Sequence, residues 1–145
     1  MVSFLWRFFD SPEPETTVNP FVDVKHDRFE KAILWAYENG ITKGTDGSHF
    51  DPEGLCTRKQ IVAFLWRSAG RPDVTAVKNP FTDVAAGSKF EDPILWAFEN
   101  GITRGKTDTT FLPDGICTRG QIVSFLYRYN QQLEKEEPIR ASDLG

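Results

Sequence analysis

The chain is poor in the residues that build metal centres, disulfide frameworks and membrane spans. Its 145 residues include two cysteines, two histidines and one methionine. Two cysteines can form one disulfide at most, and with two distant histidines they match no familiar zinc spacing. No window approaches 18 consecutive apolar residues, and the first residues lack the basic and apolar regions of an export signal. We therefore expect no metal, no cofactor, no membrane insertion and no signal peptide in this chain.

Excess positive charge is absent as well. Seventeen Lys and Arg against 21 Asp and Glu give a net charge of −4. Such a chain has no field that attracts phosphate backbones, so nucleic acid is not an expected partner. Hydrophobic residues at 39% and aromatic residues at 13% exclude a disordered chain and predict a packed protein.

The sequence contains two copies of one unit. FEKAILWAYENGITKG at residues 29–44 and FEDPILWAFENGITRG at residues 90–105 are identical at 12 of 16 positions. At the same offset of 61 residues, CTRKQIVAFLWR matches CTRGQIVSFLYR at nine of 12 positions. VSFLWR at residues 2–7 repeats the end of that segment once more. The chain is therefore a repeat protein with units of about 60 residues.

These matches divide the chain into segments. Two full repeats are predicted at residues 19–70 and 79–130, preceded at residues 1–9 by the final helix of a truncated repeat. Between them, the Pro-containing and polar residues 10–18 and 71–78 are predicted linkers. The remaining residues, 131–145, are charged and weakly apolar, which predicts a tail or linker.

Each unit is predicted to hold two helices. The first spans residues 27–39 in the first unit and ends at Gly40 in a left-handed turn. The second begins with a capping box, in which a threonine and a glutamine bond each other's backbone: Thr57 with Gln60, and Thr118 with Gln121. The preceding cysteine is equivalent in both units, which favours two buried thiols over a disulfide.

The apolar residues of the second helix predict how the units pack. They span an arc of about 200°, whereas a single packing partner requires about 100°. We therefore expect this helix to contact the first helix of its own unit and the second helices of other units. With residues 1–9 there are three such second helices, so the simplest architecture is a three-helix core with helix-loop-helix arms.

Arg58 and Arg119 are the strongest candidates for binding. Each follows a capping threonine, in a first helical turn where a cation opposes the helix dipole. One interpretation is a receptor for a carboxylate or phosphate, because the guanidinium would lie beside free N-terminal amides. The other is a partner within the chain, and the obvious choices are the aspartates of the NPFVDV and NPFTDV segments, Asp23 and Asp83. The residues alone leave both interpretations open.

Other repeated residues carry weaker signals. Trp35 and Trp96 point away from the core side of the first helix, and packing on a neighbouring repeat is favoured over stacking on a ligand. The polar loops after Gly44 and Gly105 resemble ligand-facing loops but lack the acidic pattern of a calcium loop. Neither GxSxG nor HExxH occurs. We therefore expect a binding protein rather than an enzyme.

The order of these signals resembles the S-layer homology family. FxDV, AILWAxENGIT, a Gly-rich loop, FxPxG and TRxQIVxFLxR follow one another twice between about residues 19 and 130. The family's Thr-Arg-Ala-Glu motif is matched at Thr57-Arg58 and Thr118-Arg119. The chain departs from that motif at Lys59, Gly120, Gln60 and Gln121.

The resemblance implies an all-α fold, in which helix-loop-helix units pack as a pseudo-threefold spindle around a central three-helix bundle. It also implies a non-catalytic module that binds anionic, often pyruvylated, secondary cell-wall polysaccharide and anchors a protein at the surface of Gram-positive bacteria. The carbohydrate-binding residues expected on this basis are Arg58, Arg119, Thr57, Thr118, Trp35, Trp96, Gly44, Gly105, Asp23 and Asp83.

A second function remains open on the same scaffold. A protein-interaction or secreted effector protein could use exposed aromatic residues without anchoring to a glycan. The incomplete first repeat predicts exposed apolar surface and self-association. By resemblance, the expected location is the bacterial cell surface or the medium, whereas the interaction protein would be released or retained inside the cell.

Overall fold

The computed structural model describes residues 1–16, 18–26, 29–52, 54–75 and 78–136, without the side chains of Arg119 and Glu136. These residues form only α-helices, which confirms the predicted all-α class for the described chain. None of their helices is long and apolar enough to cross a membrane. The helices are α1 (Val2–Phe8), α2 (Glu30–Glu38), α3 (Arg58–Ser68), α4 (Glu91–Glu99) and α5 (Arg119–Glu136).

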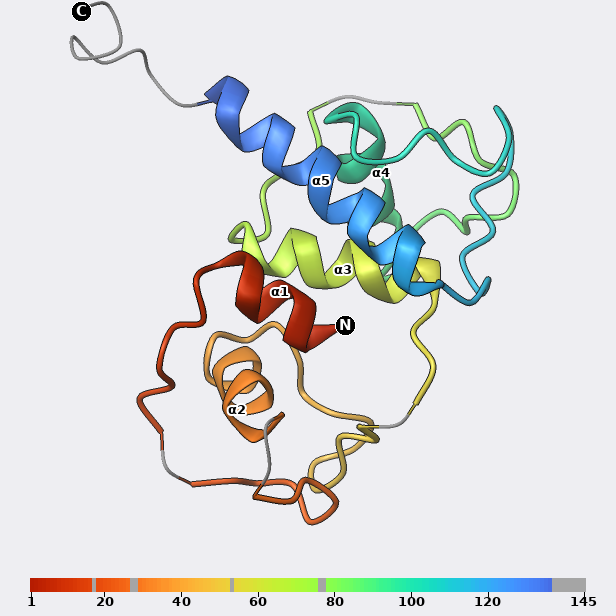
Figure 1. Cartoon of the computed structure of the whole chain (residues 1–145). Coiled ribbons are helices and arrows are strands. Elements are labelled where there is room, and N and C mark those ends of the chain that lie inside the picture. The colour runs from red at the N-terminus through yellow and green to blue at the C-terminus, as the bar shows by residue number, and fades with distance from the viewer. Residues whose placement is uncertain (17, 27–28, 53, 76–77, 137–145) are drawn as a thin grey trace, which may run out of the picture.

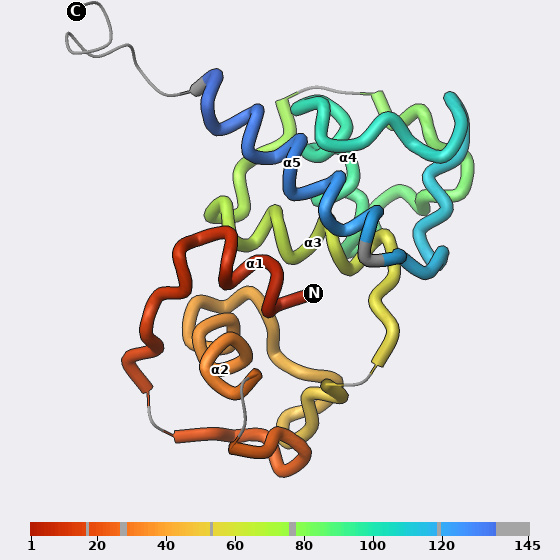
Figure 2. Tube along the Cα trace, viewed as in Figure 1, coloured from red at the N-terminus to blue at the C-terminus, as the bar shows by residue number. Residues whose placement is uncertain are grey.

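The last helix of one unit packs against the first helix of the next unit. Helix α1 contacts α2, and α3 contacts α4. No Cα atom of α3 lies within 8 Å of α2, which belongs to the same unit. The prediction that a second helix packs on its own first helix is therefore wrong for α3 and α2, whereas in the second unit the Trp96 ring of α4 contacts Tyr129 of α5. The long loop inside each unit carries the chain away from α2 before α3 begins, as the tube in Figure 2 shows.

Helix α5 links the remaining second helices. It contacts both α1 and α3. Figure 1 shows α1 lying between α2 on one side and α3 and α5 on the other. No Cα atom of α1 lies within 8 Å of α3. Equivalent leucines of the three helices are buried in one core cluster: Leu5, Leu65 and Leu126. The core is therefore built around α5.

Two helix ends differ from the sequence prediction. Helix α2 begins at Glu30 with Phe29 as its N-cap residue, and the predicted start at residues 27–28 lies outside the described residues. Helix α5 continues to Glu136, beyond the end of the predicted repeat at residue 130. The rest of the predicted tail, residues 137–145, lies outside the described residues.

The two cysteines are free thiols that lie on adjoining segments of the two units. The amide of Cys117 donates to the carbonyl of Cys56 at 2.9 Å, beside an antiparallel bridge between Thr57 and Ile116. Burial raises the pKa of the Cys56 thiol to about 11. The preference for buried thiols over a disulfide is confirmed.

Each polar loop folds back on the aromatic residue of its NPF segment. In the second unit the ring of Phe81 lies 5.4 Å from Phe98 and 5.7 Å from Phe111, measured between ring centroids. Gly105 opens this loop with φ +85°, and a Cβ there would come within 2.6 Å of both the Phe81 ring and the Thr107 carbonyl oxygen. Gly44 is equally crowded at φ +80°. Both glycines are therefore required for packing.

Replacing Gly105→Ala should lower the free energy of unfolding by about 2–4 kcal/mol, because strain from the left-handed backbone adds to a steric clash. Gly87→Ala is the matched control, since Gly87 has φ +78° and a methyl group on its Cα would meet no atom within 4 Å. The control should lose only about 1–2 kcal/mol. Equal losses in urea unfolding of the two variants would show that the Phe81 contact is unimportant.

Candidate functional site

Arg58 lies at the junction of the two full repeats. Its Nε atom donates to the carbonyl oxygen of Phe111 at 2.8 Å. The guanidinium carbon lies 4.8 Å from the ring centroid of Phe111 and 5.6 Å from that of Phe125 in α5. Only 8% of the residue is exposed. Arg58 therefore joins its own unit to the loop and the last helix of the next unit.

The amides at the start of α3 are occupied by the same loop. The Arg58 amide donates to the Gly115 carbonyl at 2.9 Å, and the Lys59 amide donates to the Pro113 carbonyl at 3.0 Å. The expectation of free N-terminal amides beside Arg58 is therefore wrong at this helix. The reason lies in the tertiary structure, because the loop of the second unit covers this helix end and supplies carbonyl acceptors.

Asp23 and Asp83 hold loops and form no ion pair with Arg58. The carboxylate of Asp83 accepts the amides of Phe111 and Leu112 at 2.9 and 2.8 Å. Burial lowers the pKa of Arg58, and the negative charge of Asp83 opposes this shift more weakly. The intramolecular interpretation of Arg58 is therefore partly confirmed, but its direct partner is the Phe111 carbonyl and not an aspartate.

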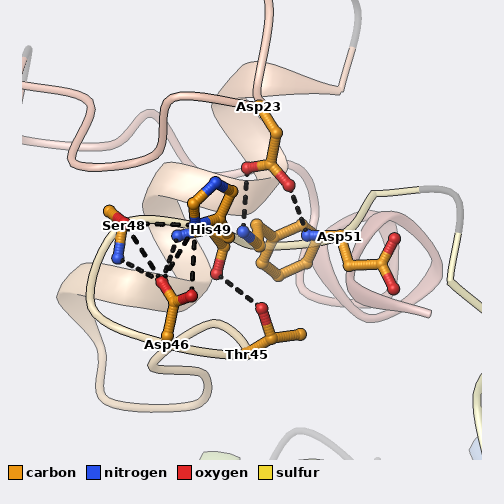
Figure 3. Close-up of polar contacts among 7 residues, drawn as sticks. Asp23, Thr45, Asp46, Ser48, His49 and Asp51 are labelled. Carbon is orange, nitrogen blue, oxygen red and sulfur yellow. Dashed lines mark hydrogen bonds and ion pairs between the residues drawn. The ribbon is translucent and has the colours of Figure 1, made fainter.

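In the first unit Asp23 holds the loop in the same way as Asp83, and a second carboxylate, that of Asp46, accepts hydrogen bonds within the turn of this loop. Asp23 accepts the amides of Phe50 and Asp51, and these bonds lower the pKa of its carboxyl group. Figure 3 shows Asp46 of the same loop facing His49 and Ser48. Bonds from the Ser48 amide and the His49 ring lower the pKa of Asp46 to about 2. These carboxylates are engaged in stabilising the loop.

Both capping boxes form as predicted. The Thr57 amide donates to the Gln60 side chain at 2.8 Å, and the Thr118 amide donates to that of Gln121 at 2.9 Å. Each threonine hydroxyl in turn accepts the glutamine amide. The side chain of Arg119 lies outside the described residues. The structure therefore gives both threonines a role in starting a helix.

Trp35 packs against the preceding unit, as favoured from the sequence, whereas Trp96 contacts an aromatic residue of its own unit. The Trp35 ring lies 5.9 Å from Phe9 after α1, and the Trp96 ring lies 5.9 Å from Tyr129 in α5. They are 9% and 5% exposed. The structure does not bring Trp35 together with Arg58, because Trp35 lies near the far end of α3.

A cavity of about 500 Å³ lies beside Trp35, where α1, α2 and α3 end. Two arginines that the sequence prediction did not single out, Arg67 and Arg71, line this cavity. Arg67 Nη1 donates to the Ile41 carbonyl at 3.0 Å, and Arg71 Nη2 donates to the Gly40 carbonyl at 2.9 Å. We call this cavity the Trp35 groove. The sequence feature that could have pointed to this cavity is the arginine at the end of each FLxR motif, which is Arg67 in the first unit.

The electrostatics of the Trp35 groove favour an anion. Burial and the charge of Arg71 both lower the pKa of Arg67, because two cations share a partly desolvated site. Neither arginine forms an ion pair with a described carboxylate. A negatively charged group between them would relieve this repulsion and accept bidentate hydrogen bonds.

Acidic residues border the other side of Trp35. A smaller hollow of about 310 Å³ there is lined by Glu13, Glu15 and Glu38. Glu38 is already engaged, since its carboxylate accepts the amides of Glu15 and Thr16 at 2.9–3.0 Å. Glu38 therefore fixes the connection after α1.

A metal-binding arrangement is not found in the part of the chain that the structure describes. No group of three or more His, Cys, Asp or Glu side chains there is placed to hold a metal ion. The described fold and the Trp35 groove together define a repeat-built binding module.

Sequence comparison identifies the repeats. The profile of the S-layer homology domain matches residues 20–62 and 80–123, together more than half of the chain. The chain belongs to the S-layer homology family, whose domains are non-catalytic anchoring modules.

Three relatives show where such segments occur. The chain is 32% identical to an endoglucanase of Bacillus sp. (strain KSM-635) over 86% of its own length and 13% of the relative. For a cell surface protein of Thermoanaerobacter kivui the values are 28%, 87% and 18%. For a cellulosome-anchoring protein of Acetivibrio thermocellus they are 29%, 66% and 22%. The chain therefore spans less than a quarter of each of these relatives.

Replacing Arg58→Ala should lower the free energy of unfolding by about 2–3 kcal/mol, because a charge-assisted hydrogen bond and two ring contacts are lost. Arg104→Ala removes an equal charge from an exposed position and should change stability by less than about 0.5 kcal/mol. Denaturant unfolding of both variants measures the difference. A similar stability for the two would contradict the role of Arg58 in joining the repeats.

Proposed function

We propose that this chain is a cell-wall-binding module that anchors a protein at a bacterial surface by binding an anionic, pyruvylated polysaccharide. The observation that carries the proposal is the pair of arginines in the Trp35 groove. Membership of the S-layer homology family and the names of two relatives, a cell surface protein and a cellulosome-anchoring protein, support the anchoring role. The module itself contributes binding and no catalysis.

A pyruvyl acetal suits the Trp35 groove because it places a carboxylate on the edge of a sugar ring. The guanidinium groups of Arg67 and Arg71 supply planar donors for this carboxylate. Asn39 and the partly accessible ring of Trp35 border the same cavity and would contact the sugar. Neutral wall glycans lack the charge that the two arginines require.

The residues predicted from the family motif keep a place in this proposal. Arg58 is largely enclosed, so we propose that it acts mainly by holding adjacent units in position. The same indirect role applies to the capping, loop and packing residues Thr57, Thr118, Gly44, Gly105, Asp23, Asp83 and Trp96. Direct contact of Arg119 with the glycan remains a prediction.

Arg71→Gln should weaken cosedimentation with purified, pyruvylated cell-wall material by at least tenfold, because Arg71 is exposed and its loss removes one carboxylate donor. Arg104→Gln is the control of equal charge and should bind normally. Chemical removal of pyruvate from the wall should have the same effect as Arg71→Gln, and Arg58→Ala with Arg119→Ala should also reduce binding. If wall binding survives both depyruvylation and Arg71→Gln, the proposed ligand is wrong.

A second candidate function, protein interaction, is favoured by one face of α5. Val2 and Val62 are 5% and 0% exposed because α2 and α4 contact their helices, whereas the equivalent Val123 is 51% exposed. Tyr127, one turn further along, is 62% exposed. We propose that two copies of the chain associate by packing these α5 faces against each other about a twofold axis.

Light scattering after size-exclusion chromatography should show a concentration-dependent dimer, because association buries the exposed apolar residues of α5. Val123→Lys with Tyr127→Lys should yield monomers. Val22→Lys alters a residue that is 75% exposed and lies away from α5, and it should leave the dimer intact. A wild-type chain that stays monomeric up to millimolar concentration would contradict self-association.

A further inference from the structure

The two full repeats differ at the position of the Trp35 groove. The repeat offset aligns Ser68 with Tyr129 and Arg71 with Gln132, while Trp35 aligns with Trp96. Most other residues of the two units are identical or similar around this position. Ser68 and Arg71 both lie on the wall of the groove that carries the arginines in the first unit.

In the first unit that wall is open because α3 ends at Ser68. Gly70 and Arg71 both have left-handed backbones, with φ +86° and +55°. This turn brings the Arg71 side chain back to the Gly40 carbonyl. The small side chain of Ser68 and the second arginine then border the cavity together.

In the second unit the same wall is continuous helix. Helix α5 runs through to Glu136, so no turn follows residue 129. Tyr129 is 3% exposed, and its ring lies 5.9 Å from Trp96 and 5.7 Å from Phe8. Arg128 keeps the contact of Arg67, with its Nη1 atom 3.5 Å from the Ile102 carbonyl, but Gln132 replaces the second arginine.

The opposite wall of the groove, on the side of the preceding unit, also differs between the two units. Phe9, whose ring contacts Trp35, aligns with Ala69, so the second unit loses an aromatic ring on the side of the preceding unit. Tyr129 supplies a ring from the other side, next to Arg128. The aromatic cover of Trp96 therefore occupies the wall from which Arg67 and Arg71 face the cavity in the first unit.

We infer that the two grooves are not equivalent: the Trp35 groove accepts the acidic sugar, and Tyr129 closes the corresponding groove at Trp96. This inference rests on the proposed function, since it assigns the ligand to one of two repeated positions. Tyr129 and Ser68 are then the residues that determine how many acidic sugars one chain binds. A chain with one such site depends on a single groove for its hold on the wall.

The probe for the test is the methyl glycoside of a hexose that carries a cyclic pyruvyl acetal, titrated into the full chain. Calorimetry should give one site per chain, and the indole N–H signal of Trp35 should shift in NMR spectra while that of Trp96 stays in place. The same glycoside without pyruvate should shift neither signal. Ser68→Tyr should weaken binding at least tenfold by filling the open cavity.

Tyr129→Ser with Gln132→Arg should open the second groove, raise the stoichiometry from one to two and make the Trp96 signal respond. Tyr129→Phe keeps the ring and should stay at one site, and circular dichroism confirms that both variants are folded. If the variant Tyr129→Ser with Gln132→Arg does not fold, Ser68→Tyr is the deciding test.

The outcomes separate the inference from the function on which it rests. Two equal sites in the wild-type chain, a Trp96 response in the wild-type chain or undiminished binding by Ser68→Tyr would overturn the inference while leaving wall binding in place. Wall cosedimentation without a Trp35 response would do the same. Absence of both glycoside binding and wall cosedimentation would overturn the proposed function and the inference together.

Discussion

The backbone of Phe111 joins the two repeats, and the rest of the assembly depends on this junction. Its amide is held by Asp83 of its own unit, and its carbonyl accepts Arg58 from the preceding unit. The Phe111 ring is fully buried, between the NPF aromatic residue and the guanidinium of Arg58. One residue thereby fixes the loop, the start of α3 and the distance between units.

This junction gives Arg58 of the family motif a role in stabilising the fold. A buried guanidinium requires partners, and a carbonyl with two aromatic faces satisfies it without a direct ion pair. Because the N-terminal end of α3 is covered in this way, the proposed ligand site lies at the opposite end of the helix. There the helix stops, carbonyls of the α2 turn orient Arg67 and Arg71, and a cavity remains open.

Much of the local structure followed from the sequence, because it depends on residues close together in the chain. The capping boxes, the glycine stops and the buried thiols are set by neighbours within a few positions. The packing of Trp35 on the preceding unit followed from the direction of its side chain around the helix. The partner of Arg58 did not, since Phe111 lies 53 positions away. Glu38 was missed for the same reason, as its acceptor role concerns a segment of the preceding connection.

The repeat, the all-α class and the family could be predicted from the sequence, because periodic apolar residues and capping signals act locally and recur. Only the tertiary structure decided which helix each second helix covers and where the arginines gather. Pairing between units is set by the length of the loops and by the volume of side chains that meet from distant segments. The sequence alignment of the two units shows Ser68 opposite Tyr129. The structural consequence of this difference depends on α3 ending beside Trp35 and α5 continuing beside Trp96.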